Sequence, residues 1–262
     1  MALDRATVQQ LAAELLEAER TRQPIAPLTE RYPALTEADA YAVQLAIIDQ
    51  KLVAGARVVG KKIGLTSLAM QRMLNVDQPD YGHILDTMTI MEGGECPIDD
   101  LIQTRVEPEI AFVLKDDLVG PNVTREQVLA ATAYVTPALE IIDSRVRDWK
   151  IKLGDTVADN ASSARVVLGT TTTPVDAVNL RLVGCVLEKN GEVVGTAAGA
   201  AALGDPAVAV AWLANKLASY DIPLKAGEII MPGALTKAEA VARGDVIRAT
   251  YDRLGSVSVK FV

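Results

Sequence analysis

The first 55 residues place apolar side chains at the three- and four-residue spacing of amphipathic helices. The apolar face of a first predicted helix consists of Val8, Leu11, Leu15 and Ala18. A second helix is expected to begin after Thr36, because Asp39 three residues later completes a variant of the capping box. Gly55 is its expected end. Prolines between the two runs break helical structure, so we predict two separate N-terminal helices.

Beyond Gly55 the pattern changes to the short apolar or alternating runs that are typical of strands. Strands are predicted over residues 57–65, 110–114, 135–142, 164–168, 182–188, 228–231, 246–251 and 256–262. Asn190-Gly191 predicts a hairpin, and helix caps predict short helices at 124–133 and after Asp205-Pro206. Regular strand–helix alternation is absent, which disfavours a doubly wound sheet or a TIM barrel. We therefore predict an α+β fold, with a helical N-terminal region (1–70) and a β-rich catalytic body (71–262).

Composition then narrows the class of function. The 262 residues include 26 Lys and Arg against 34 Asp and Glu, a net charge of −8, which argues against a nucleic-acid-binding surface. No stretch reaches the roughly 20 apolar residues of a membrane-spanning helix, so no membrane association is expected. Cys96 and Cys185 form no CxxC pair, and a cytoplasmic location is expected. Neither a GxGxxG motif nor a Walker A loop is present, which disfavours nucleotide chemistry.

Three carboxylates stand among strand-forming residues and could bind a metal. Glu107 and Glu109 are two positions apart, so in an extended chain both side chains point to the same face. Glu140 lies in a second apolar run, where an unpaired buried carboxylate would be costly. Three carboxylates suit Mg²⁺ or Mn²⁺, which prefer oxygen ligands, and the lack of a histidine cluster argues against zinc. The alternative is an exposed strand end with solvated glutamates.

Three further polar residues have ordinary explanations. Lys61 and Lys62 lie in a strand-like run, where alternation points them to opposite faces and a lysine is by default a solvated edge residue. Asp80 follows a proline in Gln78-Pro-Asp-Tyr-Gly82 and is by default a turn former. Taken by themselves, these residues could be either ordinary structural residues or catalytic residues.

Four separated segments, in order along the chain, carry a family resemblance. They are Gly60-Lys-Lys-Ile-Gly-Leu-Thr-Ser67, Glu107-Pro-Glu109, Glu140-Ile-Ile-Asp-Ser-Arg145 and Thr156-Val-Ala-Asp-Asn-Ala-Ser162. Together they resemble the fumarylacetoacetate hydrolase superfamily, and most closely its hydratase and decarboxylase branch. The resemblance covers nearly the whole chain and implies a mixed β-sandwich or roll. It also implies that Glu107, Glu109 and Glu140 bind Mg²⁺ or Mn²⁺.

Five other residues have expected roles, and the resemblance assigns those of Lys62, Asp80 and Ser162. Lys62 and Asp80 become the candidates for proton transfer and water activation, with the pKa of Lys62 lowered by burial near the metal. Ser162 is expected near the substrate carboxylate, with an ordinary loop hydroxyl as the alternative. Leu65 is expected in the core or in the wall of the substrate pocket. Arg105 is expected either to steer the substrate carboxylate or to form a structural ion pair.

The activity implied by this branch is the addition of water to 2-hydroxypenta-2,4-dienoate, which gives 4-hydroxy-2-oxopentanoate in meta-cleavage catabolism of aromatic compounds. Alternatives are decarboxylation of 4-oxalocrotonate, hydration of a longer dioic acid, and a non-catalytic assembly partner. Asp80 favours hydration, because related decarboxylases tend to carry an apolar residue there. The resemblance further implies a homo-oligomer, which could associate with another enzyme of the same pathway.

Some positions depart from the family pattern or add to it. Pro232 stands where relatives commonly have Thr or Ser, which removes a hydroxyl and a backbone donor and puts substrate contacts there in doubt. Asp205 replaces a common His and is expected to act as a helix cap. For His83, next to Gly82, a local polar contact is expected in preference to a role as catalytic acid.

Overall fold

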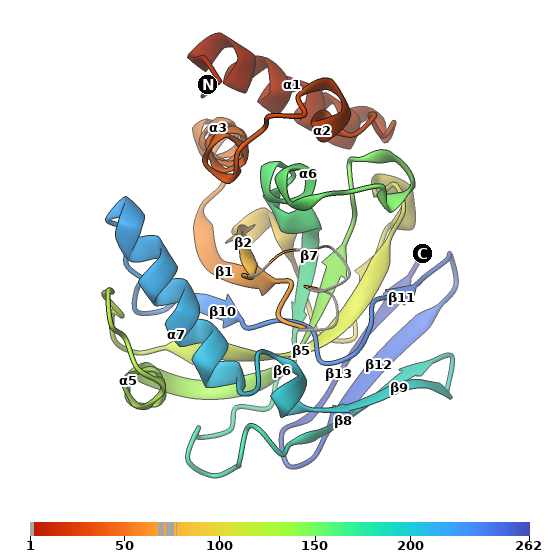
Figure 1. The fold of residues 1–262 in the computed structure, drawn as a ribbon. Coiled ribbons are helices and arrows are strands. Elements are labelled where there is room, and N and C mark those ends of the chain that lie inside the picture. Colours follow the sequence, from red (N-terminus) through yellow and green to blue (C-terminus); the bar gives the residue numbers. More distant parts are fainter. Residues whose placement is uncertain (1–2, 68–70, 72–75, 77) are drawn as a thin grey trace.

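The computed structural model describes residues 3–67, 71, 76 and 78–262 (Figure 1). Its α-helices are α1 (Arg5–Thr21), α2 (Leu28–Arg31), α3 (Glu37–Val53), α5 (Arg125–Ala131), α6 (Leu153–Ala158) and α7 (Pro206–Leu217). Its 3-10 helices are η1 (Asp86–Met88), η2 (Ile98–Asp100), η3 (Arg147–Trp149), η4 (Asn160–Ser162), η5 (Gly199–Ala201) and η6 (Ala218–Tyr220). No helix in this described part of the chain is long and apolar enough to span a membrane.

The strands form two sheets. They are β1 (Val58–Gly64), β2 (Asp80–Leu85), β3 (Thr89–Ile90), β4 (Glu95–Cys96), β5 (Arg105–Leu114), β6 (Thr132–Ile142), β7 (Ser163–Leu168), β8 (Gly184–Lys189), β9 (Glu192–Ala198), β10 (Ile229–Met231), β11 (Glu239–Ala240), β12 (Val246–Tyr251) and β13 (Gly255–Phe261). The eight-stranded sheet has the order β2-β1-β10-β5-β6-β7-β3, with β11 paired to β5. The five-stranded sheet has the order β4-β13-β12-β8-β9. The predicted α+β class is confirmed.

The two faces of strand β5 have different surroundings. We call the face that carries Ala111 the functional face, because it also carries two glutamates. Ile110 and Phe112, on one face of β5, belong to the main hydrophobic core. The intervening residue Ala111 belongs to a small separate apolar cluster with Ala138 and Met231. Because side chains alternate along a strand, the face of β5 that carries Ala111 also carries its two glutamates.

The two N-terminal helices lie at one end of the molecule, where α3 packs against both α1 and α6 (Figure 1). Thr36 and Asp39 form the expected capping box, in which the Asp39 amide donates to the Thr36 hydroxyl at 3.2 Å. Gln44 on α3 reaches into the body and donates to the backbone carbonyls of Tyr81 and Val157. The helical region is therefore hydrogen-bonded directly to the segments that surround the functional face.

Two details that bear on the site differ from the sequence-based prediction. Strand β5 begins at Arg105, five residues before the predicted start, because Pro108 interrupts the pattern without ending the strand. Asp80 begins strand β2, which was not predicted, and so is not in a turn. Strand β1 pairs with β2 and β10 in the large sheet although it precedes residue 70. The division of the chain at that residue stays a prediction.

A candidate carboxylate metal centre

Antiparallel pairing of β5 and β6 brings the three predicted glutamates together. Glu107 lies directly opposite Glu140 in the register, and Glu109 lies opposite Ala138. One carboxylate oxygen from each of Glu107, Glu109 and Glu140 lies within 4.8 Å of the others. Glu109 and Glu140 are fully buried. Glu107 is partly exposed, so the alternative of solvated glutamates at a strand end is excluded only for Glu109 and Glu140.

Several oxygens of this cluster lack hydrogen-bond partners. Within the described residues, neither carboxylate oxygen of Glu140 has a partner, and Oε1 of Glu109 has none. Burial and the neighbouring Glu140 raise the pKa of Glu107 to about 7 and hold the pKa of Glu109 well above its ordinary value. A bound cation would satisfy buried carboxylate oxygens that lack hydrogen-bond partners, and this donor set fits Mg²⁺ or Mn²⁺.

Gly233 supports the cluster in a way that sequence reasoning missed. Its amide donates to Oε2 of Glu109 at 2.8 Å. Its φ is +115°, and an added Cβ would lie 2.1 Å from the Thr66 hydroxyl oxygen. A side chain at this position would therefore be strained and would collide. Pro232 offers no donor, and in this structure the amide that follows it is directed at Glu109.

The two neighbouring lysines point to opposite faces of β1, as alternation predicts. Nζ of Lys61 lies 2.6 Å from Glu228. Nζ of Lys62 lies 3.3 Å from Oε2 of Glu140 and donates to the Ala161 carbonyl at 2.9 Å. Burial opposes the charge of Lys62, but Glu140 and the other site carboxylates outweigh it and raise its pKa. This direction is opposite to the lowered pKa expected from the sequence, and a bound cation would counteract it.

Asp80 lies next to Lys62, above Gly64. An added Cβ on Gly64 would lie 2.2 Å from Oδ1 of Asp80 and 3.3 Å from Nζ of Lys62. Asp80 is 1% exposed, and its Oδ1 has no hydrogen-bond partner within the described residues. Burial raises the pKa of Asp80, and Lys62 opposes this effect. A buried lysine and a buried carboxylate thus stand side by side at the edge of the glutamate cluster.

The other predicted residues occupy three different settings. Ser162 is buried, and its Oγ lies 3.5 Å from the Thr156 hydroxyl. Leu65 directly follows β1 with a φ of 56°, at the end of the strand that carries Lys62. The Arg105 guanidinium lies 4.6 Å from the centre of the Trp149 ring, a cation–π contact. The described residues show no ion pair to Arg105 within 4.0 Å, so its structural contact is aromatic.

His83 makes the expected local polar contact. Its Nδ1 lies 3.1 Å from the side-chain oxygen of Gln44. His83 is paired with Lys61 in the sheet, on the face opposite to Lys62. Burial, with Lys61, lowers the pKa of His83 to about 4, so the ring is neutral at pH 7. This placement disfavours His83 as the acid of the site.

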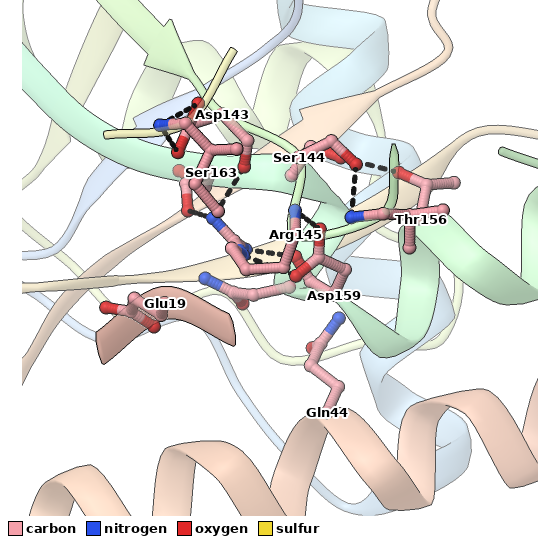
Figure 2. Close-up of polar contacts among 12 residues, drawn as sticks. Glu19, Gln44, Asp143, Ser144, Arg145, Thr156, Asp159 and Ser163 are labelled. Atoms are coloured by element: carbon pink, nitrogen blue, oxygen red, sulfur yellow. Dashed lines mark hydrogen bonds and ion pairs between the residues drawn. The ribbon is translucent and has the colours of Figure 1, made fainter. Parts of the chain in front are cut away.

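A buried polar network, which sequence reasoning also missed, joins the segment that follows β6 to Asp159 (Figure 2). Arg145 pairs with Asp159 through its side chain and its backbone amide. Arg145 also donates to the carbonyl of Asp143, whose carboxylate accepts the amides of Ile102 and Gln103. All three charged residues are at least nine-tenths buried. The motif Glu-Ile-Ile-Asp-Ser-Arg thus combines one candidate metal ligand with two structural residues.

The raised pKa of Glu107 predicts a pH dependence of stability in the metal-free protein. A carboxyl group whose folded pKa is raised stabilises the fold below its ordinary pKa, and that contribution disappears as pH rises through the folded value. We therefore expect the metal-free protein to melt at progressively lower temperature between about pH 5 and 7, relative to a Glu107→Gln variant. Scanning fluorimetry of both proteins across this range measures the difference. A pH-independent difference would contradict the raised pKa.

Comparison with known proteins agrees with this geometry. Residues 84–262 match the family model described as fumarylacetoacetate (FAA) hydrolase C-terminal. The chain is 45% identical over 260 residues to 2-hydroxyhexa-2,4-dienoate hydratase of Comamonas testosteroni, covering 98% of each chain. It is 49% identical over 221 residues to 2-hydroxypent-2,4-dienoate hydratase of Pseudomonas putida, covering 84% of this chain and 100% of the relative.

A solved structure shares the whole fold. It is 4-oxalocrotonate decarboxylase from Pseudomonas putida G7 in complex with magnesium and adipate, with a TM-score of 0.97 and 42% identity, covering 100% of this chain and 99% of the other. The fold and the buried carboxylates thus define a β-rich protein with a candidate site for a divalent cation. More particularly, the chain belongs to the fumarylacetoacetate hydrolase family.

Proposed function

We propose that this protein is a metal-dependent hydratase that adds water to 2-hydroxypenta-2,4-dienoate and forms 4-hydroxy-2-oxopentanoate. The observation that carries this proposal is the cluster of Glu107, Glu109 and Glu140, with unpartnered buried oxygens, beside the buried pair Lys62 and Asp80. The names of the hydratase relatives support the reaction and the substrate class. The three glutamates would hold Mg²⁺ or Mn²⁺.

The residues of the site have different proposed roles in the reaction. A cation held by the glutamates would act as a Lewis acid towards the carboxylate and the 2-oxygen of the substrate. Ketonisation of the dienol requires loss of the enol proton and delivery of a proton to C5. Water then adds its oxygen to C4 and a proton to C3. We assign these proton transfers to Lys62 and Asp80, and we propose that Ser162 and Leu65 contact the substrate.

Decarboxylation of 4-oxalocrotonate is the second candidate, because the closely matching solved structure is such an enzyme. Asp80 favours hydration on physical grounds. Water addition needs a group that accepts a proton from the incoming water, whereas loss of CO₂ does not. The buried carboxylate of Asp80, with an unpartnered Oδ1, can serve as that acceptor.

A direct assay tests the proposal. The purified protein, loaded with Mg²⁺ or Mn²⁺, is incubated with 2-hydroxypenta-2,4-dienoate while the dienol absorbance is followed. We expect metal-dependent loss of the absorbance and formation of 4-hydroxy-2-oxopentanoate, detected by mass spectrometry. The matched control is the same protein treated with a chelator. Persistent dienol together with CO₂ release from 4-oxalocrotonate would replace the hydratase by the decarboxylase.

We further propose a cytoplasmic homo-oligomer that acts in meta-cleavage catabolism of aromatic compounds, either by itself or in association with another enzyme of that pathway. The names of the hydratase relatives support the catabolic role, and the assembly is what the family resemblance implies. Sedimentation velocity of the metal-loaded protein tests the assembly. A monomer at all concentrations would contradict it.

A further inference from the structure

The segment Asn160–Ser162 (η4) forms a buried turn of unusual backbone conformation. All three of its residues carry a Cβ, and their φ angles are 52°, 49° and 57°. The left-handed conformation is unfavourable for such residues, because Cβ approaches the following carbonyl oxygen. Three consecutive residues in this state persist only where the surrounding structure enforces it. Two sets of contacts do so here.

The first set holds the entry to the turn. Arg145 donates from its guanidinium to both the carboxylate and the carbonyl of Asp159, the residue that directly precedes the turn (Figure 2). Its backbone amide donates to the second carboxylate oxygen of Asp159 at 2.9 Å. At the other end, the Ser162 carbonyl accepts the amide of Asp143 at 2.8 Å. Both ends of the turn are thus tied to the segment that follows β6.

The second set docks the turn on β2. The side-chain oxygen of Asn160 accepts the His83 amide at 2.8 Å, and its side-chain nitrogen donates to the His83 carbonyl at 2.9 Å. These two bonds imitate the pairing of a neighbouring strand. An added Cβ on Gly82 would lie 2.5 Å from the Asn160 carbonyl oxygen. The turn therefore lies against β2 at a distance that only glycine permits.

The middle of the turn contacts the proposed catalytic lysine. The Ala161 carbonyl accepts a hydrogen bond from Nζ of Lys62, and Lys62 is paired with Gly82 in the sheet. A lysine side chain has four rotatable bonds, so its ammonium needs an anchor to occupy a single position. Within the described residues, Ala161 supplies the one hydrogen-bond acceptor found for this ammonium, which lies 3.3 Å from Glu140.

We propose that the left-handed turn, clamped by Arg145 and docked on Gly82, positions the Lys62 ammonium beside the glutamate cluster. Arg145, Asn160 and Gly82 are then positioning residues, which act on the reaction through the Ala161 carbonyl. The relevance of this positioning to proton transfer rests on the proposed hydratase function. The placement of the ammonium itself does not.

A spectroscopic experiment tests the placement independently of activity. The probe is the ¹H–¹⁵N ammonium resonance of Lys62 in the Mg²⁺-loaded, ¹⁵N-lysine-labelled protein, assigned with Lys62→Met. We expect a resonance protected from exchange in the wild type. It should be lost in Gly82→Ala, which pushes the turn away, and in Asn160→Gly, which keeps the backbone conformation accessible but removes both bonds to His83. Gly184→Ala is the matched control, because a Cβ there meets nothing within 4 Å.

Kinetic measurements then test whether the position of the Lys62 ammonium affects turnover. In the folded variants we expect kcat to fall about 10–100-fold, as misplacement of a catalytic group by about 1 Å can cost, with KM and Mg²⁺ affinity retained. If Gly82→Ala does not fold, Asn160→Gly decides. No protected resonance in the wild type, or an unchanged resonance and kcat in folded variants, would overturn the proposal. If the wild type does not hydrate the dienol, the proposed function fails while the ammonium spectra still decide the positioning.

Discussion

Replacing Glu107 with Gln is expected to abolish metal-dependent turnover and, at the same time, to raise the melting temperature of the metal-free protein. The two effects have a common cause. Glu107 lies opposite Glu140, and burial and that neighbour raise its pKa to about 7, so the ionised cluster is costly without a cation. A neutral amide of similar shape removes this repulsion. It also removes one of three anionic oxygen ligands.

The loss of metal affinity should be large, because Glu107 is one of three clustered carboxylate ligands. Loss of a group that merely orients a metal ligand typically costs about 10–100-fold in metal affinity, so loss of a ligand should cost at least as much. Calorimetric titration with Mn²⁺ measures the affinity, and scanning fluorimetry with and without Mn²⁺ measures the stabilisation by the ion. We expect Mn²⁺ to raise the melting temperature of the wild type and to leave that of Glu107→Gln unchanged.

Glu126→Gln is the matched control, because it makes the same chemical change on a side chain that is 76% exposed. It should behave as the wild type in metal affinity and turnover. Full metal-dependent activity in Glu107→Gln would show that the glutamate cluster is not the metal site. A variant that is unfolded without metal would contradict the electrostatic account, since the cluster is then needed for folding.

Elements with local signals could be predicted from the sequence. Helix α3 begins after the capping box of Thr36, α5 after the cap of Thr124, and α7 after Asp205, because each cap is formed by residues close in sequence. The Asn190-Gly191 hairpin follows the same logic. Strand β2 could not be predicted, since its burial on both faces leaves no alternation to detect. The parallel pairing of β1 with β10 joins residues far apart in sequence, and no local pattern specifies it.

The candidate site likewise has some features that the sequence predicts and others that it does not. That Glu107 and Glu109 share a face follows from their spacing. That Glu140 lies opposite Glu107 depends on the register of β5 and β6, which the sequence does not reveal. The contacts of Gly82 and Gly233 became visible only in three dimensions, because a glycine that permits close approach looks the same in sequence as one in an open loop. The family resemblance, rather than periodicity, singled out Lys62 and Asp80.

Asp80→Asn should lower kcat for hydration by about 10²–10⁴-fold, the usual contribution of general acid–base catalysis. The substitution keeps the size of the side chain beside Lys62 and Gly64 but removes its ability to take a proton from water. Because burial raises the pKa of Asp80, the neutral amide should fold at least as stably as the carboxylate. Mn²⁺ affinity should change little, since Asp80 is not one of the three clustered ligands.

The pH profile separates catalysis from structure. Asp80 is one of the carboxylates that raise the pKa of Lys62, so its neutralisation should lower that pKa and move the alkaline limb of the residual activity to lower pH. Asp86→Asn is the matched control: Asp86 directly follows β2, and its carboxylate pairs with an exposed arginine, Arg57. That variant should keep both kcat and the profile of the wild type. Equal losses of kcat and Mn²⁺ affinity in Asp80→Asn would instead make Asp80 a support for the metal cluster, and the proton transfers would then fall to Lys62.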